Sequence, residues 1–263
     1  MKVGLATIAF RGYDLTVALD AAAECKCDGV ELWGKSPHLP QPYDEKKVKG
    51  IREEIEKRGL VVSIFGSYVN PINENFRENA QDAIKVAQDI GTSLIRVWAG
   101  NQDGIDAPAD MWRTCIEGYK WFCKLAADAG IILAVETHNN SLADMPDGMM
   151  RLIEETGAEN LMANYQLSHI ERPEDMARGI EVLGPYIVNV HAQNFKVGAK
   201  GKPQRTNLED GDVDYREVIS LLRKFEFDGF VEVEFIKDES GERDSLLKSL
   251  RKDIDFLKKL IRD

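Results

Sequence analysis

Short runs of apolar and β-branched residues recur along the whole chain and alternate with amphipathic stretches. The amphipathic stretches have helical spacing, as in Ala80, Ala83, Ile84 and Ala87. Continuous apolar strands flanked by helices are typical of a parallel sheet that is covered on both faces. We predict eight strands, at residues 3–7, 29–33, 60–65, 94–98, 131–136, 161–165, 187–191 and 230–234.

The regular repetition of this unit predicts a closed (β/α)8 TIM barrel. The chain has 263 residues, the usual size of one such barrel, so we predict a single domain over residues 1–263. A doubly wound open sheet is the alternative, and it would carry a glycine-rich turn after its first strand. The segment at that place, Ala9-Phe10-Arg11-Gly12-Tyr13, lacks this fingerprint.

Glycines mark the turns that lead from a predicted helix into the next strand. A helix end favours glycine because other residues are strained in the left-handed backbone conformation. These glycines are Gly59, Gly91, Gly130, Gly157 and Gly229. By contrast, long polar segments follow the strands at residues 34–44, 99–111, 138–147 and 192–213. Barrel enzymes build their active sites from the loops that follow the strands, so we expect function there.

Histidines and carboxylates gather at the predicted strand ends. All four histidines lie at or just beyond such an end: His38, His138, His169 and His191. Glu136 ends the fifth strand and Glu234 the eighth. A carboxylate there is costly to bury without a positive partner, and two carboxylates with a histidine are typical metal ligands. Glu232 shares a face with Glu234 and remains an alternative, although Glu234 is nearer the mouth.

The composition argues against nucleic acid and membranes as partners. Lys and Arg number 34 and Asp and Glu 45, and the resulting net charge of −11 repels phosphate backbones. No apolar run approaches the ~18 residues of a membrane span, and no signal-peptide core follows Met1, so we expect a cytoplasmic protein. We expect all four cysteines to be reduced and structural: Cys25, Cys27, Cys115 and Cys123.

Several short motifs, in this order and spacing, together resemble the xylose isomerase-like barrel family. They are Gly29-Val30-Glu31-Leu32-Trp33, Val135-Glu136-Thr137-His138-Asn139, Ser168-His169, His191, Gly211-Asp212-Val213-Asp214-Tyr215 and residues 228–234. The resemblance spans essentially the whole chain. The family includes sugar epimerases, hydroxypyruvate isomerase, inosose dehydratase and the apurinic endonucleases. The motifs are therefore more specific for the family than for any one activity.

The resemblance implies one divalent metal ion, which would be Mn, Mg, Co or Zn, with four protein ligands. Three of the ligands are Glu136, His191 and Glu234. The fourth is commonly an Asp after the sixth strand, and Gln166 stands at that place. Gln offers an oxygen without a charge, which predicts weaker metal binding and greater Lewis acidity. A changed or lost metal is the alternative.

The resemblance also implies roles for the residues around the metal. Glu136 and Glu234 would transfer the proton, and His138 or His169 would shuttle it or orient the substrate. We expect substrate contacts from Trp33, His38, Trp98, Asn139 and Arg205. For the two tryptophans, packing at the barrel rim is an equal alternative to an apolar substrate wall.

The implied activity is that of an isomerase or epimerase on a small keto-sugar. The metal would polarise the carbonyl, a carboxylate would remove the adjacent proton, and a metal-bound enediolate would form. A dehydratase or lyase acting on a keto-sugar or cyclitol shares this first step, and a non-catalytic sugar-binding barrel is a third class. The family habit suggests a homodimer or homotetramer.

The endonuclease branch of the family fits this chain poorly. That branch binds three metal ions with extra histidines after the third and fourth strands. Gly66-Ser67 and Gly100-Asn101 stand at these places here. Together with the acidic net charge, this excludes a nuclease from the favoured functions.

Overall fold

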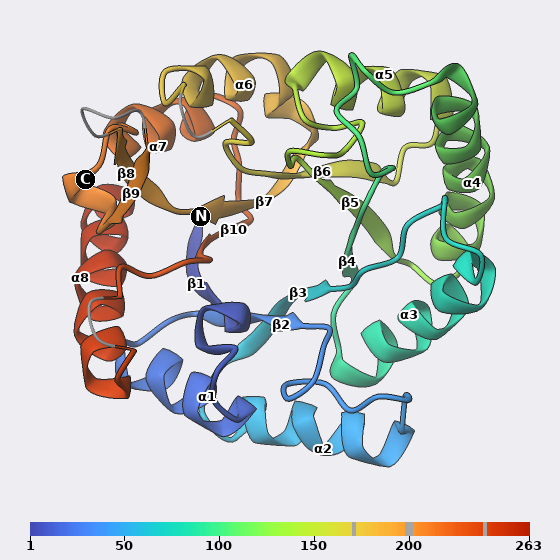
Figure 1. Ribbon diagram of the computed structural model, residues 1–263. Helices are drawn as coiled ribbons and strands as arrows, with labels where there is room; N and C mark the ends of the chain where they lie inside the picture. Colours follow the sequence, from blue (N-terminus) through green and yellow to red (C-terminus); the bar gives the residue numbers. More distant parts are fainter. Residues whose placement is uncertain (170–171, 198–201, 239–240) are drawn as a thin grey trace.

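Eight parallel strands close into a barrel that is ringed by helices (Figure 1). The computed structural model describes residues 1–169, 172–197, 202–238 and 241–263. Around the barrel the strands follow the order β1, β10, β7, β6, β5, β4, β3, β2. They are β1 (Lys2–Ala6), β2 (Gly29–Trp33), β3 (Val61–Gly66), β4 (Leu94–Val97), β5 (Ile132–Glu136), β6 (Leu161–Tyr165), β7 (Ile187–Ala192) and β10 (Phe230–Val233). The predicted (β/α)8 TIM barrel is confirmed.

The helices form the outer layer, so the strands are covered on their outer side. They are α1 (Leu15–Glu24), α2 (Glu45–Glu56), α3 (Phe76–Ile90), α4 (Ala109–Asp128), α5 (Pro146–Thr156), α6 (Asp175–Leu183), α7 (Tyr215–Lys224) and α8 (Arg243–Arg262). Short 3-10 helices lie at Thr7–Phe10, Gly184–Tyr186 and Leu208–Asp210. Apolar side chains between the strands and the helices form one core, as expected for this layered architecture.

Four of the five predicted helix-ending glycines have the left-handed backbone conformation. Gly91 and Gly157, with φ of 81° and 66°, directly follow α3 and α5. The prediction for Gly229 was wrong, because Glu226 takes the left-handed conformation after α7. A Cβ at Gly229 would clash with the carbonyl oxygen of Val188, so close backbone approach explains this glycine.

The segment after β7, predicted as a long loop, contains a two-stranded antiparallel hairpin. Its strands are β8 (Asn194–Val197) and β9 (Pro203–Thr206). Residues 198–201 of the predicted loop 192–213 lie outside the described residues. The hairpin brings Arg205 beside Phe195, which pairs with it in register.

The cysteines agree with the expectation that they are reduced and structural. All four cysteines are buried and free: Cys25, Cys27, Cys115 and Cys123. Burial raises the pKa of the Cys25 thiol to about 11, so this thiol stays protonated. Within the described part of the chain, no helix is long and apolar enough to cross a bilayer.

Candidate metal centre and active site

Glu136, His191 and Glu234 converge at the carboxyl ends of their strands. They lie at the end of β5, within β7 and directly after β10, and each is at most 3% exposed. Nδ1 of His191 lies 3.5 Å from Oε1 of each glutamate. One ligand atom from each residue lies within 4.8 Å of the other two. We call these three residues the inner group.

The inner group fits a divalent cation. Oε2 of Glu234 is buried and has no hydrogen-bond partner among the described residues, although such oxygens are costly to leave unpaired. Imidazole nitrogen and carboxylate oxygens suit Mn, Mg, Co and Zn. Burial, together with the charges of Glu136 and Glu31, outweighs His191 and raises the pKa of Glu234 to about 7. A cation at this place would pair with the free oxygen of Glu234 and offset the repulsion among the carboxylates.

Two charged residues that sequence reasoning missed lie beside the inner group. Arg96, in β4, donates from Nη1 to Oε2 of Glu136 at 2.5 Å. Its Nε lies 3.8 Å from Oε1 of Glu31, in β2. Burial favours a neutral Glu136, but the Arg96 guanidinium and His191 together outweigh it and lower the pKa of this carboxyl group. Glu136 is therefore held as a carboxylate.

The sequence did contain a signal for these two residues. Glu31 and Arg96 stand in the middle of otherwise apolar strands, Gly29–Trp33 and Leu94–Val97. Charged residues are rarely buried unless they are paired, so each one implies a partner inside the barrel.

Gln166 faces Glu136 with its amide nitrogen. Its Nε2 donates to Oε1 of Glu136 at 2.8 Å, and its Oε1 accepts from Nε2 of Gln193 at 2.9 Å. The orientation of both amides follows from Arg205, which can only donate and does so to Oε1 of Gln193 at 2.8 Å. Ligation of a metal by the Gln166 oxygen would require both amides to rotate, so in this arrangement Gln166 supports Glu136.

Glu232, the alternative to Glu234, lies deeper in the barrel. Its two carboxylate oxygens accept hydrogen bonds from Ser63 at 2.6 Å and from Asn189 at 3.0 Å. Burial and the charge of Glu31 raise its pKa to about 8. Because both oxygens have partners, Glu232 has less need of a cation than Glu234.

Aromatic rings line one side of the inner group. Trp98 stacks on Tyr68, with ring centroids 6.1 Å apart and planes at 11°. The ring of His138 lies 4.8 Å from that of Trp98, and Nε1 of Trp33 donates to the Tyr68 hydroxyl at 2.8 Å. Nε1 of Trp98 is buried without a hydrogen-bond partner among the described residues. Tyr68 was missed by sequence reasoning, because it lies in a loop outside any motif.

Two further predicted substrate contacts lie next to this wall. His38 is 1% exposed, its Nε2 contacts the carbonyl of Tyr13 at 3.1 Å, and its ring lies edge-on to that of Trp33, with centroids 5.4 Å apart. Asn139 is half-buried, and its carbonyl lies 2.6 Å from Nδ1 of His138. Asn139 therefore orients a candidate proton shuttle.

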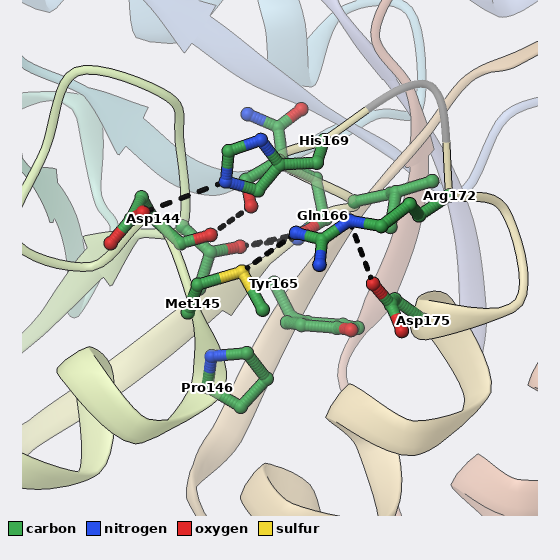
Figure 2. A pocket seen from close by; sticks show the side chains of 11 residues that line it. Asp144, Met145, Pro146, Tyr165, Gln166, His169, Arg172 and Asp175 are labelled. Carbon is green, nitrogen blue, oxygen red and sulfur yellow. Dashed lines mark hydrogen bonds and ion pairs between the residues drawn. The ribbon is translucent and has the colours of Figure 1, made fainter. Parts of the chain in front are cut away.

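His169 lies beside a small cavity and contacts Asp144 (Figure 2). Its Nε2 lies 3.5 Å from Oδ2 of Asp144, and both residues border a cavity of about 20 Å³ together with Gln166. Asp103, Asp144 and His169 offer ligand atoms within 4.8 Å of one another, and we call them the outer group. His169 thus lies in the outer group and not in the inner group.

This chain belongs to the family described as the xylose isomerase-like TIM barrel, whose model matches residues 19–260. Among curated proteins it is 25% identical to 3-dehydroshikimate dehydratase of Bacillus anthracis, over 85% of this chain and 87% of that protein. It is 21% identical to hydroxypyruvate isomerase of Escherichia coli K12, over 86% and 89% of the two chains. These relatives are enzymes of different classes.

Solved structures share the fold at lower identity. A probable 3-DHS dehydratase from Bacillus anthracis has a TM-score of 0.80 at 22% identity, covering 98% of this chain and 99% of that one. D-psicose 3-epimerase from Clostridium cellulolyticum, solved with D-tagatose, has 0.77 at 15%, covering 99% of each. A Mycobacterium smegmatis barrel in complex with magnesium has 0.78 at 16%, covering 99% and 96%.

Proposed function

We propose that this chain is a divalent-metal-dependent enzyme that removes a proton from the carbon next to a carbonyl group of a small, sugar-like substrate. The convergence of Glu136, His191 and Glu234, with Oε2 of Glu234 left without a partner, is the observation that supports it most directly. A divalent cation held there would polarise the carbonyl and its neighbouring hydroxyl and acidify the intervening C–H bond.

The surroundings of the two glutamates suggest different roles for them. Glu234 is suited to accept the proton, because one of its oxygens is buried without a partner within the described chain. Without a cation, burial raises the pKa of Glu234 to about 7, and a bound cation would lower it again. Glu136 is suited to be a ligand, because Arg96 keeps it charged as a carboxylate. Environments that separate the pKa values of two acids in this way are typical of acid–base assignments.

His138 is the best candidate for moving a proton between substrate oxygens. The carbonyl of Asn139 accepts from its Nδ1, which leaves Nε2 as the nitrogen that can take up a proton. Its ring packs against Trp98, and Trp98 stacks on Tyr68. In our proposal this aromatic wall excludes water and fixes the plane of the substrate.

What happens after the first proton transfer defines the enzyme class. Return of the proton to the same or the neighbouring carbon gives epimerisation or isomerisation, and the similarity to hydroxypyruvate isomerase supports this class. Loss of a β-hydroxyl group gives dehydration, and the similarity to 3-dehydroshikimate dehydratase favours it as the second candidate. Both classes need the same base and the same cation.

Proton exchange with solvent tests the shared step. Purified protein with Mn²⁺ is incubated in D2O with D-tagatose, D-fructose, hydroxypyruvate and 3-dehydroshikimate, and deuterium is located by NMR after removal of the metal. We expect deuterium next to the carbonyl of at least one compound and none with the Glu234→Gln variant. New ketose signals identify an epimerase, new aldose or aldehyde signals identify an isomerase, and an added C=C bond identifies a dehydratase. Failure to exchange with any compound while Mn²⁺ is bound would favour a sugar-binding barrel without catalysis.

A further inference from the structure

The imidazole of His191 is held by a carboxylate on the side that faces away from the other candidate ligands. Oε2 of Glu31 lies 2.5 Å from Nε2 of His191, and the two side chains are 3% and 0% exposed. Strands β2 and β7 are not neighbours in the barrel, so the contact crosses its interior. We propose that Glu31 is a positioning residue that fixes His191 for metal ligation, a role that rests on the proposed metal centre.

The two ring nitrogens of His191 have different surroundings. Nδ1 faces Glu136 and Glu234 at 3.5 Å each, whereas Nε2 faces Glu31. An imidazole that binds a metal through one nitrogen keeps its proton on the other and donates it to an acceptor. Glu31 thus retains the proton on Nε2 and leaves the Nδ1 lone pair for the cation.

Asn164 does not replace Glu31 as that acceptor. Its Nδ2 lies 3.1 Å from Nε2 of His191, and its Oδ1 accepts from Asn189 at 2.9 Å. Asn164 therefore presents N–H groups to the ring. Among the contacts of the described residues, only Glu31 offers Nε2 an acceptor oxygen.

The neighbouring strand provides space for the Glu31 carboxylate. A Cβ at Gly66, in β3, would clash with Oε1 of Glu31, so the absence of a side chain at this position admits the carboxylate. Arg96 lies 3.8 Å away and supplies the countercharge. The negative charge of Glu31 can be buried here because the carboxylate accepts a hydrogen bond from His191 and lies near the Arg96 guanidinium.

Measurement of metal affinity distinguishes a positioning role of Glu31 from a general structural role. Mn²⁺ binding is measured by isothermal titration calorimetry for the wild type and for Glu31→Gln. Loss of a carboxylate that orients a ligand histidine typically costs 10–100-fold in affinity, and we expect a loss of about that size. Asp253→Asn is the matched control, because it also neutralises a buried acid, but Asp253 contacts Asn207 and Leu208 rather than His191. We expect this control to stay within about threefold of the wild type.

Proton NMR provides a readout that does not need a bound metal. The Nε2 proton of His191, assigned with a His191→Gln variant, should resonate at low field in the wild type and move upfield in Glu31→Gln. Glu31→Asp, which keeps the charge but shortens the reach, serves if Glu31→Gln is poorly folded, and it should weaken Mn²⁺ binding as well.

Equal affinity losses in Glu31→Gln and Asp253→Asn would overturn the positioning role, as would an unchanged Nε2 proton. If the wild type binds no Mn²⁺, the proposed function fails, and the proton shift then decides alone whether Glu31 orients His191.

Discussion

In the described part of the barrel, one histidine and two carboxylates meet around His169 and, in two combinations that share the imidazole, around His191. The surroundings of the two histidines differ. The inner group is Glu136, His191 and Glu234, and the outer group is Asp103, Asp144 and His169. Each inner residue is at most 3% exposed, whereas only Asp144 of the outer group is buried. The same residue types thus meet in a nearly water-free interior in one case and at a half-exposed rim in the other.

The two groups also differ in the hydrogen bonds that their carboxylate oxygens accept. Oδ1 of Asp103 accepts from the backbone N–H of Asn140 at 2.6 Å, and Oδ1 of Asp144 accepts from that of Gly104 at 3.0 Å. These bonds tie the loops after β4 and β5 together. The inner group instead contains a buried oxygen of Glu234 without a partner in the described chain. Burial with an unsatisfied oxygen, rather than residue composition, distinguishes the candidate metal site.

The largest expected effect comes from Glu136→Gln. This change leaves the buried Arg96 without its closest carboxylate, and breaking a buried pair typically costs about 3–5 kcal/mol. We expect the free energy of unfolding, measured in urea, to fall by about that amount. The corresponding outer change, Asp103→Asn, should cost about 1 kcal/mol because its partner is a single backbone N–H. Equal losses would remove the contrast between the groups.

Next in size is the effect of Glu234→Gln on metal affinity. Removal of a charged ligand should weaken Mn²⁺ binding by about 100-fold or more, beyond what loss of a supporting residue causes. Asp144→Asn, the outer counterpart, should leave the affinity unchanged. Calorimetry of both variants measures this, and a large loss in Asp144→Asn would instead locate the metal in the outer group.

The Gln166→Asp variant tests whether a further negative charge in the inner group strengthens metal binding. The variant restores a negative charge beside Glu136 and removes the amide that now donates to it. We expect Mn²⁺ to bind about tenfold more tightly, which corresponds to about 1.4 kcal/mol. Weaker binding would mean that the hydrogen bond from Gln166 matters more than an added charge.

The smallest effect is expected from Asp144→Asn, which tests whether the outer group connects the loops after β4 and β5. Asp144→Asn keeps an oxygen that can accept from Gly104 but loses the charge facing His169. We expect a loss of about 1 kcal/mol in unfolding free energy and faster proteolysis of residues 99–108. An unchanged cleavage rate would argue against this connecting role.

The sequence predicted the barrel well because its signal is repetitive. All eight barrel strands lie at the predicted places with shifts of one residue at some ends, since apolar runs and glycine turns are local features. The hairpin of β8 and β9 was missed, because Pro203–Thr206 lacks the apolar alternation of a half-buried strand.

The site was only partly predictable. Barrel topology alone brings Glu136, His191 and Glu234 to one end, so strand-end reasoning placed them together. The orientation of Gln166 depends on Gln193 and, through it, on Arg205, and no local pattern encodes such a chain of hydrogen bonds. Residue type alone therefore does not predict which way the Gln166 amide faces.

The most direct test of the metal centre is pulsed electron paramagnetic resonance of the protein titrated with Mn²⁺. We predict one bound Mn²⁺ per chain with a hyperfine coupling to an imidazole nitrogen, and loss of that coupling in His191→Gln. Absence of stoichiometric Mn²⁺, or a nitrogen coupling that persists in His191→Gln, would contradict the assignment of Glu136, His191 and Glu234 as the ligands.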